Sequence, residues 1–259
     1  MPGTIVVFDI ETQDRISNMP GTDRDDQVCN LQISCLSFLV LDADTMLDPE
    51  EAAVEVERAA MVTLWRDEDQ DGTGPFEPLF EAFDDAEIIV SYNGLAFDHL
   101  VLFKHCRRGR TERHLLKAHD AFARLRCNTR VWFKLDNLLK SNGLETKTAN
   151  GLEAITMWNE GRREELQIYC EQVNAEAIVT LPGAHTHTLA AAQDVRALAR
   201  LLCLPELALP NTTITVPNYV FGIASAVAAS RTSKLLSMKR KFEHLAEEPS
   251  TGAVVRVDE

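Results

Sequence analysis

Two carboxylates close the first apolar run of this chain. The run spans residues 5–12 (IVVFDIET) and reads as a buried strand. Because side chains alternate along a strand, Asp9 and Glu11 point to the same face. Two acids held side by side repel each other and raise each other's pKa, a cost that a divalent cation between them removes. The pair therefore indicates either a metal site or a strand end that emerges into water.

Further acids follow later elements of the chain. Residues 87–92 read as a second buried strand, and the Asn93-Gly94 pair after it predicts a turn. The chain then restarts as a helix, which places Asp98 in the first helical turn, at the edge of the same sheet. Much later, Tyr169 and Asp194 fall in segments with a helical pattern. Asp98 is therefore expected to lie near the D-x-E pair.

The D-x-E strand, an N-x-x-x-[FY]-D turn and a Y-x-x-x-D helix, in this order, resemble the three motifs of the DEDD 3′-to-5′ exonucleases, tyrosine subgroup. That family includes the exonuclease domains of DNA polymerases. The resemblance covers about residues 4–205. It implies a ribonuclease H-like fold of the α/β class, a mixed five-stranded sheet covered by helices. Further strands predicted at 31–40 and 60–65 agree with it, as do helices predicted at 75–83 and 136–143.

The resemblance also implies a chemistry. It implies a hydrolase that cleaves phosphodiester bonds at single-stranded DNA or RNA ends with two Mg²⁺ (or Mn²⁺) ions, for which oxygen-only ligands are suited. Asp9 would bridge both ions, while Glu11 and Asp194 would hold the ion that activates water. Asp98 would hold the ion on the leaving-group side. Tyr169 would orient the attacking water, with its hydroxyl protonated at neutral pH.

The charge distribution bears on a nucleic-acid partner. The net charge of −14 opposes one, but residues 42–77 are strongly acidic and residues 104–134 carry ten Lys and Arg against two acids. Such segregation allows one face to follow a phosphate backbone. The alternative for the basic segment is a solvated helix and loop. The predicted nucleic-acid-binding residues are Asn93 and Phe97, which the resemblance places at the terminal nucleotide, and Arg107, Arg108 and Arg110.

The third motif is interrupted. Residues 173–193 separate Gln172 from Asp194, and without them the Y-x-x-x-D spacing would be complete. The stretch contains Pro182-Gly183, so it cannot simply lengthen a helix. Either it loops out and the helix resumes near Gln193, or it is a translated intron or similar gene-model error. Because of it, a catalytically impaired nuclease-like protein that only binds nucleic acid is the alternative function. A proofreading fragment is a third reading, although no polymerase palm follows.

Other features of the sequence indicate the domain organisation and the cellular compartment. We expect an exonuclease domain at 1–230 and a flexible charged tail at 231–259. The start lacks a basic n-region and no apolar run reaches transmembrane length, so we expect neither a secretory signal nor a membrane partner. The six cysteines form no C-x-x-C pair, which is typical of a reducing compartment. An intracellular location is therefore expected, with cytoplasm and nucleus both open.

Overall fold

The structure, a computed structural model, describes residues 3–67, 74–144, 151–166 and 191–233. Its centre is a five-stranded mixed sheet in the order β3-β2-β1-β4-β5. β1 is antiparallel to β2 and parallel to β4; β2 is antiparallel to β3, and β4 is parallel to β5. This α/β architecture, consistent with a ribonuclease H-like fold, confirms the predicted fold class. The strands are β1 (Thr4–Thr12), β2 (Ile33–Asp42), β3 (Met61–Trp65), β4 (Ala86–Ser91) and β5 (Ala118–Asp120).

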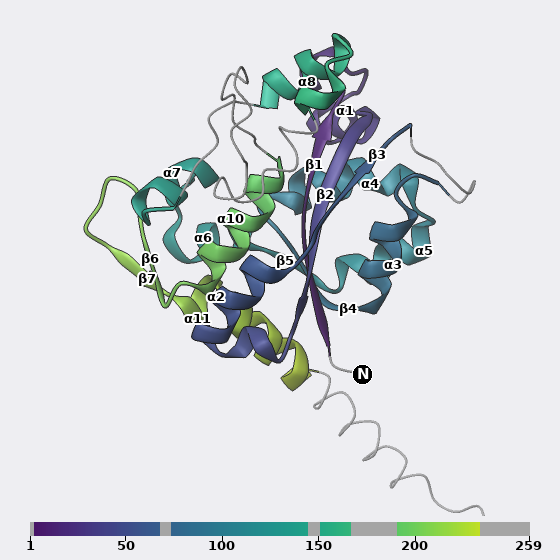
Figure 1. Cartoon of the computed structure of the whole chain (residues 1–259). Coiled ribbons are helices and arrows are strands. Elements are labelled where there is room, and N and C mark those ends of the chain that lie inside the picture. Colours follow the sequence, from purple (N-terminus) through teal and green to yellow (C-terminus); the bar gives the residue numbers. More distant parts are fainter. Residues whose placement is uncertain (1–2, 68–73, 145–150, 167–190, 234–259) are drawn as a thin grey trace, which may run out of the picture.

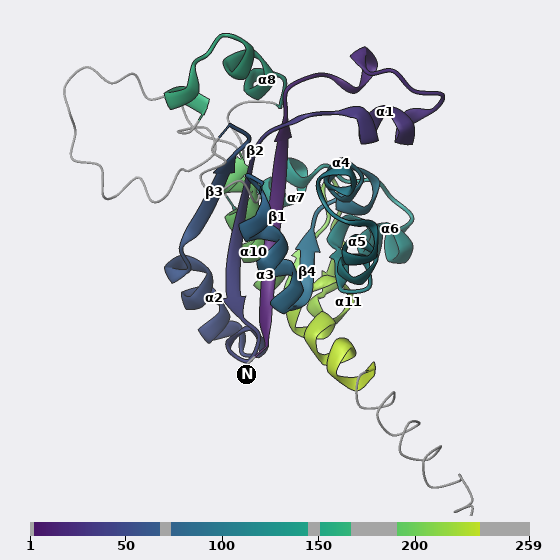
Figure 2. The same cartoon turned by 90° about the vertical axis from the view of Figure 1, so that its right-hand side faces the viewer.

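Helices cover both faces of the sheet (Figures 1 and 2). Ile5 and Val7 of β1 belong to the core on one face, and Val6, Phe8 and Ile10 belong to the core on the other. We call the first of these the α10 face. The helices packed on it are α2 (Pro49–Arg58), α6 (Ala121–Thr129), α7 (Leu135–Ser141), α10 (Ala191–Cys203) and α11 (Asn218–Phe221). The opposite face carries α1 (Arg24–Asn30), α3 (Glu77–Asp85), α4 (Asp98–Leu102) and α5 (Arg108–Leu115).

The described chain also contains a helix at the end of the sheet and a two-stranded hairpin. α8 (Gly151–Asn159) packs at the end of the sheet, where its Ala154 joins Cys35 of β2 and Trp65 of β3 in a third apolar cluster. β6 (Glu206–Ala208) and β7 (Thr215–Pro217) form a separate hairpin. Within the residues that the structure describes, no helix is long and apolar enough to cross a membrane.

Several sequence predictions can be compared with these bounds. The predicted strands at 31–40, 60–65 and 87–92 are present as β2, β3 and β4, each within two residues at either end. The domain boundary at 230 falls inside a helix, because residues 223–233 are helical. Arg231 is held there by ion pairs to Asp44 (2.7 Å) and Glu87 (3.3 Å). The rest of the predicted tail lies outside the described residues.

Arg196 fastens α10 to α2. Its side chain is buried, at 6% exposure, and its guanidinium donates to the main-chain carbonyls of Val56, Glu57 (3.1 Å) and Ala59 (2.9 Å). The last carbonyls of a helix have no partner within the helix, so a cation there satisfies them and complements the helix dipole. α10 is therefore fixed against α2 at the turn of helix that also carries Asp194.

We expect Arg196→Met to lower the free energy of unfolding by about 2–4 kcal/mol, because it leaves buried carbonyls of α2 unsatisfied. Arg200→Gln is the matched control. Arg200 also joins α10 to α2 through Glu57 (2.5 Å), but this pair is partly exposed and should cost less than about 1 kcal/mol. Urea unfolding of both variants tests the difference, and equal losses would contradict the role given to Arg196.

His105 makes stability depend on pH. Burial, then the charges of Lys104 and Arg66, lower the pKa of His105 to about 4. Its Nε2 is buried without a hydrogen-bond partner among the described residues, and its ring meets Phe76 edge-on at 5.3 Å between centroids. The unfolded chain binds this proton near pH 6.5, whereas the folded chain does not. Stability should therefore be full above pH 6.5 and fall between pH 6.5 and 4.

The fall should amount to at most about 1.4 kcal/mol per pH unit. His105→Phe keeps an aromatic ring at this position and removes the proton site, so its stability should fall less between pH 7 and pH 5 than that of the wild type. Thermal unfolding across this range measures the difference, and parallel curves for the two proteins would contradict the assignment.

Candidate active site

The D-x-E pair lies on the part of β1 that extends past β4. Pairing of β1 with β4 ends at Val7, whereas pairing with β2 continues to Thr12. The alternation of the strand places Asp9 and Glu11 on the α10 face, as it does Val7. Glu11 is 6% exposed, and Asp9 is partly exposed. The sequence prediction that both acids share a face at the end of a buried strand is therefore confirmed.

A buried carboxylate fixes the turn that follows β4. Asp120, at the end of β5, accepts hydrogen bonds from the backbone N–H groups of Asn93 (2.9 Å) and Leu95 (3.0 Å). It also caps α6 by accepting from the N–H of Ala123 (3.1 Å). Asn93 adopts the left-handed conformation (φ 64°), to which asparagine is better suited than most residues. One side chain thus holds both the turn and the start of the next helix.

Gly94 is required where this turn closes. A Cβ atom at this position would lie 2.2 Å from the Ser91 hydroxyl and 3.4 Å from Oδ2 of Asp98. The chain therefore passes close over the end of β4 only because residue 94 has no side chain. Because of this close approach to β4, the chain has returned to the side of β1 where Asp98 begins α4.

Asp98 takes the place of a strand beside β1. Its Oδ1 accepts a hydrogen bond from the backbone N–H of Ile10 (3.2 Å), on the stretch of β1 beyond its pairing with β4. Asp98 is 3% exposed. Burial, then repulsion by Asp9, raises the pKa of the Asp98 carboxyl well above its usual value, while the N–H groups of Asp98 and Ile10 oppose the rise. The first and second motifs therefore meet here as two interacting carboxyl groups.

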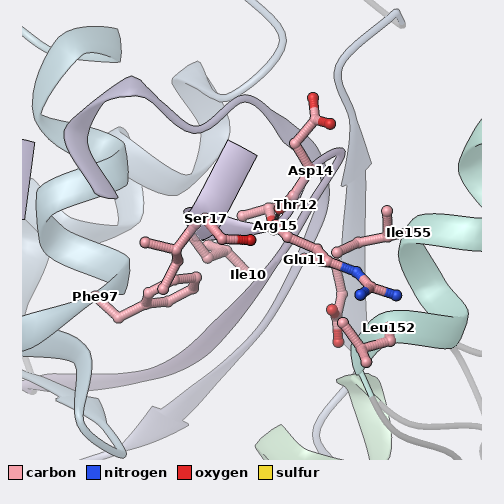
Figure 3. Close-up of a pocket in the computed structure, with 10 residues that line it drawn as sticks. Ile10, Glu11, Thr12, Asp14, Arg15, Ser17, Phe97, Leu152 and Ile155 are labelled. Carbon is pink, nitrogen blue, oxygen red and sulfur yellow. Dashed lines mark hydrogen bonds between the residues drawn. The ribbon is translucent and has the colours of Figure 1, made fainter. Parts of the chain in front are cut away.

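A pocket of about 440 Å³ adjoins this pair (Figure 3). Figure 3 shows Phe97 and Ile10 on one side and Leu152 and Ile155 of α8 on the other, with the Glu11 side chain directed toward Leu152. Phe97 and Glu11 both line this pocket, and contact of Phe97 with a terminal nucleotide stays a prediction. The side chain of Asn93 does not line this pocket. Its backbone instead forms the turn held by Asp120.

The third motif is described in part. Asp194 lies in the first turn of α10 and is 8% exposed. Figure 1 shows α10 running beside β1 with its N-terminal end toward the C-terminal end of that strand, so the first turn of α10, which carries Asp194, lies near that end of β1. α10 begins at Ala191, so the boundary drawn after Gln193 falls inside a helix. Tyr169 and residues 173–190 lie outside the described residues.

The carboxylates suit a hard cation in their chemistry but do not form a complete ligand cage. No group of three or more His, Cys, Asp and Glu side chains among the described residues is arranged to hold a metal ion. Magnesium is commonly held by one or two carboxylates together with waters and substrate phosphates. The buried Asp98 and the partly exposed Asp9 meet that requirement, because a divalent cation would cancel the repulsion between them.

The structure divides the basic segment between the two faces. α5 carries Arg108 and Arg110 on the side of the sheet opposite α10 (Figure 1). Arg110 is paired with Glu77 (2.6 Å) and Asp84 (2.7 Å), so its charge is already compensated within the protein. Arg107 and Arg108 are exposed. The arginines of α6 lie on the α10 face instead.

Comparisons with known proteins are sparse. No protein-family model matches the sequence, and no curated protein matches it. Among solved structures, the chain is similar to a family B DNA polymerase from the hyperthermophilic archaeon Pyrobaculum calidifontis, with 13% sequence identity and a TM-score of 0.44. The match covers 77% of this chain and 24% of the polymerase chain. The chain thus matches about a quarter of that protein's length, and so distant a similarity does not bear on activity.

Asp120 is the residue of the site that the sequence did not single out. We expect Asp120→Ala to destabilise the protein by about 2–4 kcal/mol, because the N–H groups of Asn93, Leu95 and Ala123 lose their acceptor. Asp120→Asn should cost less, since its amide oxygen can still accept from Asn93 and Ala123. Chemical unfolding of the two variants checks this order, and equal stability of Asp120→Ala and the wild type would contradict it.

Proposed function

We propose that this protein is a metal-dependent 3′-to-5′ exonuclease that hydrolyses phosphodiester bonds at single-stranded nucleic-acid ends. The observation that carries the proposal is the meeting of Asp98 with β1. A fully buried carboxyl group lies beside Asp9, is hydrogen-bonded to Ile10, and stands next to a pocket that Glu11 lines. Burying one carboxyl group beside a second is costly unless a charged ligand joins them, so a stability role alone does not account for the arrangement.

The proposed ligands are Asp9, Glu11, Asp98 and Asp194, and the proposed cofactor is a pair of Mg²⁺ or Mn²⁺ ions. When bound, such ions would neutralise charge on the scissile phosphate and lower the pKa of a coordinated water. The residues of this chain would supply the rest. Phe97 would offer an aromatic face to a nucleotide in the pocket, and Leu152 and Ile155 would contact it from the opposite side. The proposed role of Tyr169 in orienting the attacking water rests on the sequence resemblance.

A second candidate function is a nuclease-like protein that binds nucleic acid without cleaving it. The absence of a three-residue ligand group among the described residues favours this candidate. So does the distance in sequence between Tyr169 and Asp194. The two candidates share the fold and the basic surfaces, and they differ only in whether the carboxylates support hydrolysis.

Asp9→Asn and Asp98→Asn distinguish these candidates. If the carboxylates hold catalytic metal, each variant should cleave single-stranded DNA or RNA at least about a thousandfold more slowly than the wild type. Each should also unfold at the same temperature as the wild type or a higher one, because one of two repelling charges is gone. Oligonucleotides labelled at the 5′ end, incubated with and without Mg²⁺, show the rate and the polarity together.

Glu81→Gln is the matched control, because it removes an exposed carboxylate from α3 on the opposite face of the sheet. This variant should cleave like the wild type. Cleavage by Asp9→Asn or Asp98→Asn at the wild-type rate would exclude the metal site. A wild-type protein that binds oligonucleotides but leaves them intact in Mg²⁺ and in Mn²⁺ would favour the second candidate.

A further inference from the structure

Trp132 is an exposed aromatic side chain on the α10 side of the molecule. It lies in the loop between α6 and α7, and it is 66% exposed, while its neighbour Val131 is 48% exposed. A large indole ring left in water costs free energy that burial against a partner recovers. The exposed indole therefore offers apolar area that a ligand could cover.

The ring is nevertheless held in place by its neighbours. The Arg126 guanidinium lies over it at 4.2 Å from the ring centroid, and Phe122 meets it at 5.0 Å between centroids. Phe122 in turn meets Tyr92 at 5.6 Å. The Tyr92 hydroxyl donates a hydrogen bond to the carbonyl of Phe133 (2.6 Å), which fixes the loop. Trp132 is thus an exposed but preorganised ring.

The same contacts connect Trp132 to the candidate active site. Tyr92 directly precedes Asn93, the first residue of the turn that delivers Asp98 to β1. Two successive ring contacts therefore lead from Tyr92, at the start of this turn, to the exposed indole. Tyr92 also packs against the apolar core of the α10 face, the face toward which Asp9 points.

The charge around Trp132 is positive. Residues 121–135 contain four basic residues and no acid. All four are exposed, and none has a carboxylate partner within 4.0 Å among the residues that the structure describes. The stretch is therefore a source of uncompensated positive charge on a protein whose net charge is −14. These residues are Arg124, Arg126, Arg130 and Lys134.

We propose that Trp132 and Arg126, with Arg130 and Lys134 beside them in the chain, form a platform that binds single-stranded nucleic acid upstream of the end held at the carboxylate site. An indole face stacks on any base, and arginines follow the phosphates, so the platform is tolerant of sequence. The paired bases of a duplex offer no such face to Trp132. The inference rests on the proposed function for its substrate class, but it concerns binding rather than cleavage.

The test measures binding without cleavage. A fluorescein-labelled oligo-dT or oligo-U of about 15 nucleotides is titrated with full-length protein in EDTA, and fluorescence anisotropy is recorded at several salt concentrations. Trp132→Ala should weaken binding at least about tenfold, whereas Trp132→Phe should keep most of the affinity because a ring remains. Arg126→Ser should weaken binding and flatten the salt dependence by about one phosphate contact.

Arg124→Ser is the matched control. Arg124 is an exposed arginine of the same helix, two residues from Arg126, but it lines a different pocket with His119 and Ala226. In the Arg124→Ser background, Trp132→Ala should weaken oligonucleotide binding by the same factor as it does in the wild type. Thermal unfolding of each variant confirms that it is folded, and the Phe variant keeps the test decisive if Trp132→Ala does not fold.

The outcomes separate this inference from the proposed function. If Trp132→Ala binds the oligonucleotides as tightly as the wild type, or if the wild type does not bind them at low salt, the platform is excluded. That result leaves exonuclease activity, measured separately in Mg²⁺, free to be present or absent. If binding depends on Trp132 but no cleavage occurs in either metal, the platform stands and the exonuclease proposal fails.

Discussion

The hydrogen bond from the Ile10 N–H to the Asp98 carboxylate is the contact on which the candidate site depends. β1 extends past β4, and its backbone there needs an acceptor that no neighbouring strand supplies. Asp98 supplies it, and in doing so a carboxylate is brought beside Asp9 inside the protein. The Ile10 N–H beyond the end of β4 is thereby satisfied by a carboxylate rather than left against an apolar group. Burying the Asp98 carboxylate costs desolvation free energy, which a ligand would offset.

This contact is held in place by a series of others. Asp120 fixes the turn at Asn93, Gly94 allows the chain to pass close over β4, and Asp98 then begins α4. On the α10 face, Arg196 secures the helix turn that carries Asp194 by satisfying the end of α2. The carboxylates thus come from β1, α4 and α10, and buried polar groups position the turn before α4 and the first turn of α10. Such support is what a site requires if its geometry is to be kept within narrow limits.

Much of this arrangement could be predicted from the sequence. Alternation along β1 places Asp9 and Glu11 on one face, and the Asn-Gly turn places Asp98 near the strand. The remainder depends on contacts that local pattern does not encode. β5 has three residues and no alternating run, so neither the strand nor the role of Asp120 at its end could be read from the sequence. The pairing of Arg110 with acids of α3 likewise could not be predicted from the sequence. These acids lie far from Arg110 in the chain, where basic and acidic residues fall in separate segments.

The two halves of the basic segment differ in how far the charges of their arginines are already compensated by carboxylates of the protein. Arg110 lies over the Phe80 ring and between two carboxylates, so releasing it to a phosphate would break ion pairs already formed. Arg126 instead lies over the exposed Trp132 ring, and no acid lies within 4.0 Å of it in the described chain. A phosphate could therefore pair with Arg126 without breaking an existing ion pair. In the proposed mode of binding, a strand held at the carboxylates would therefore cross the α10 face at Trp132 rather than pass toward Arg110. The net charge of the chain, −14, would oppose the approach of a nucleic acid by other paths.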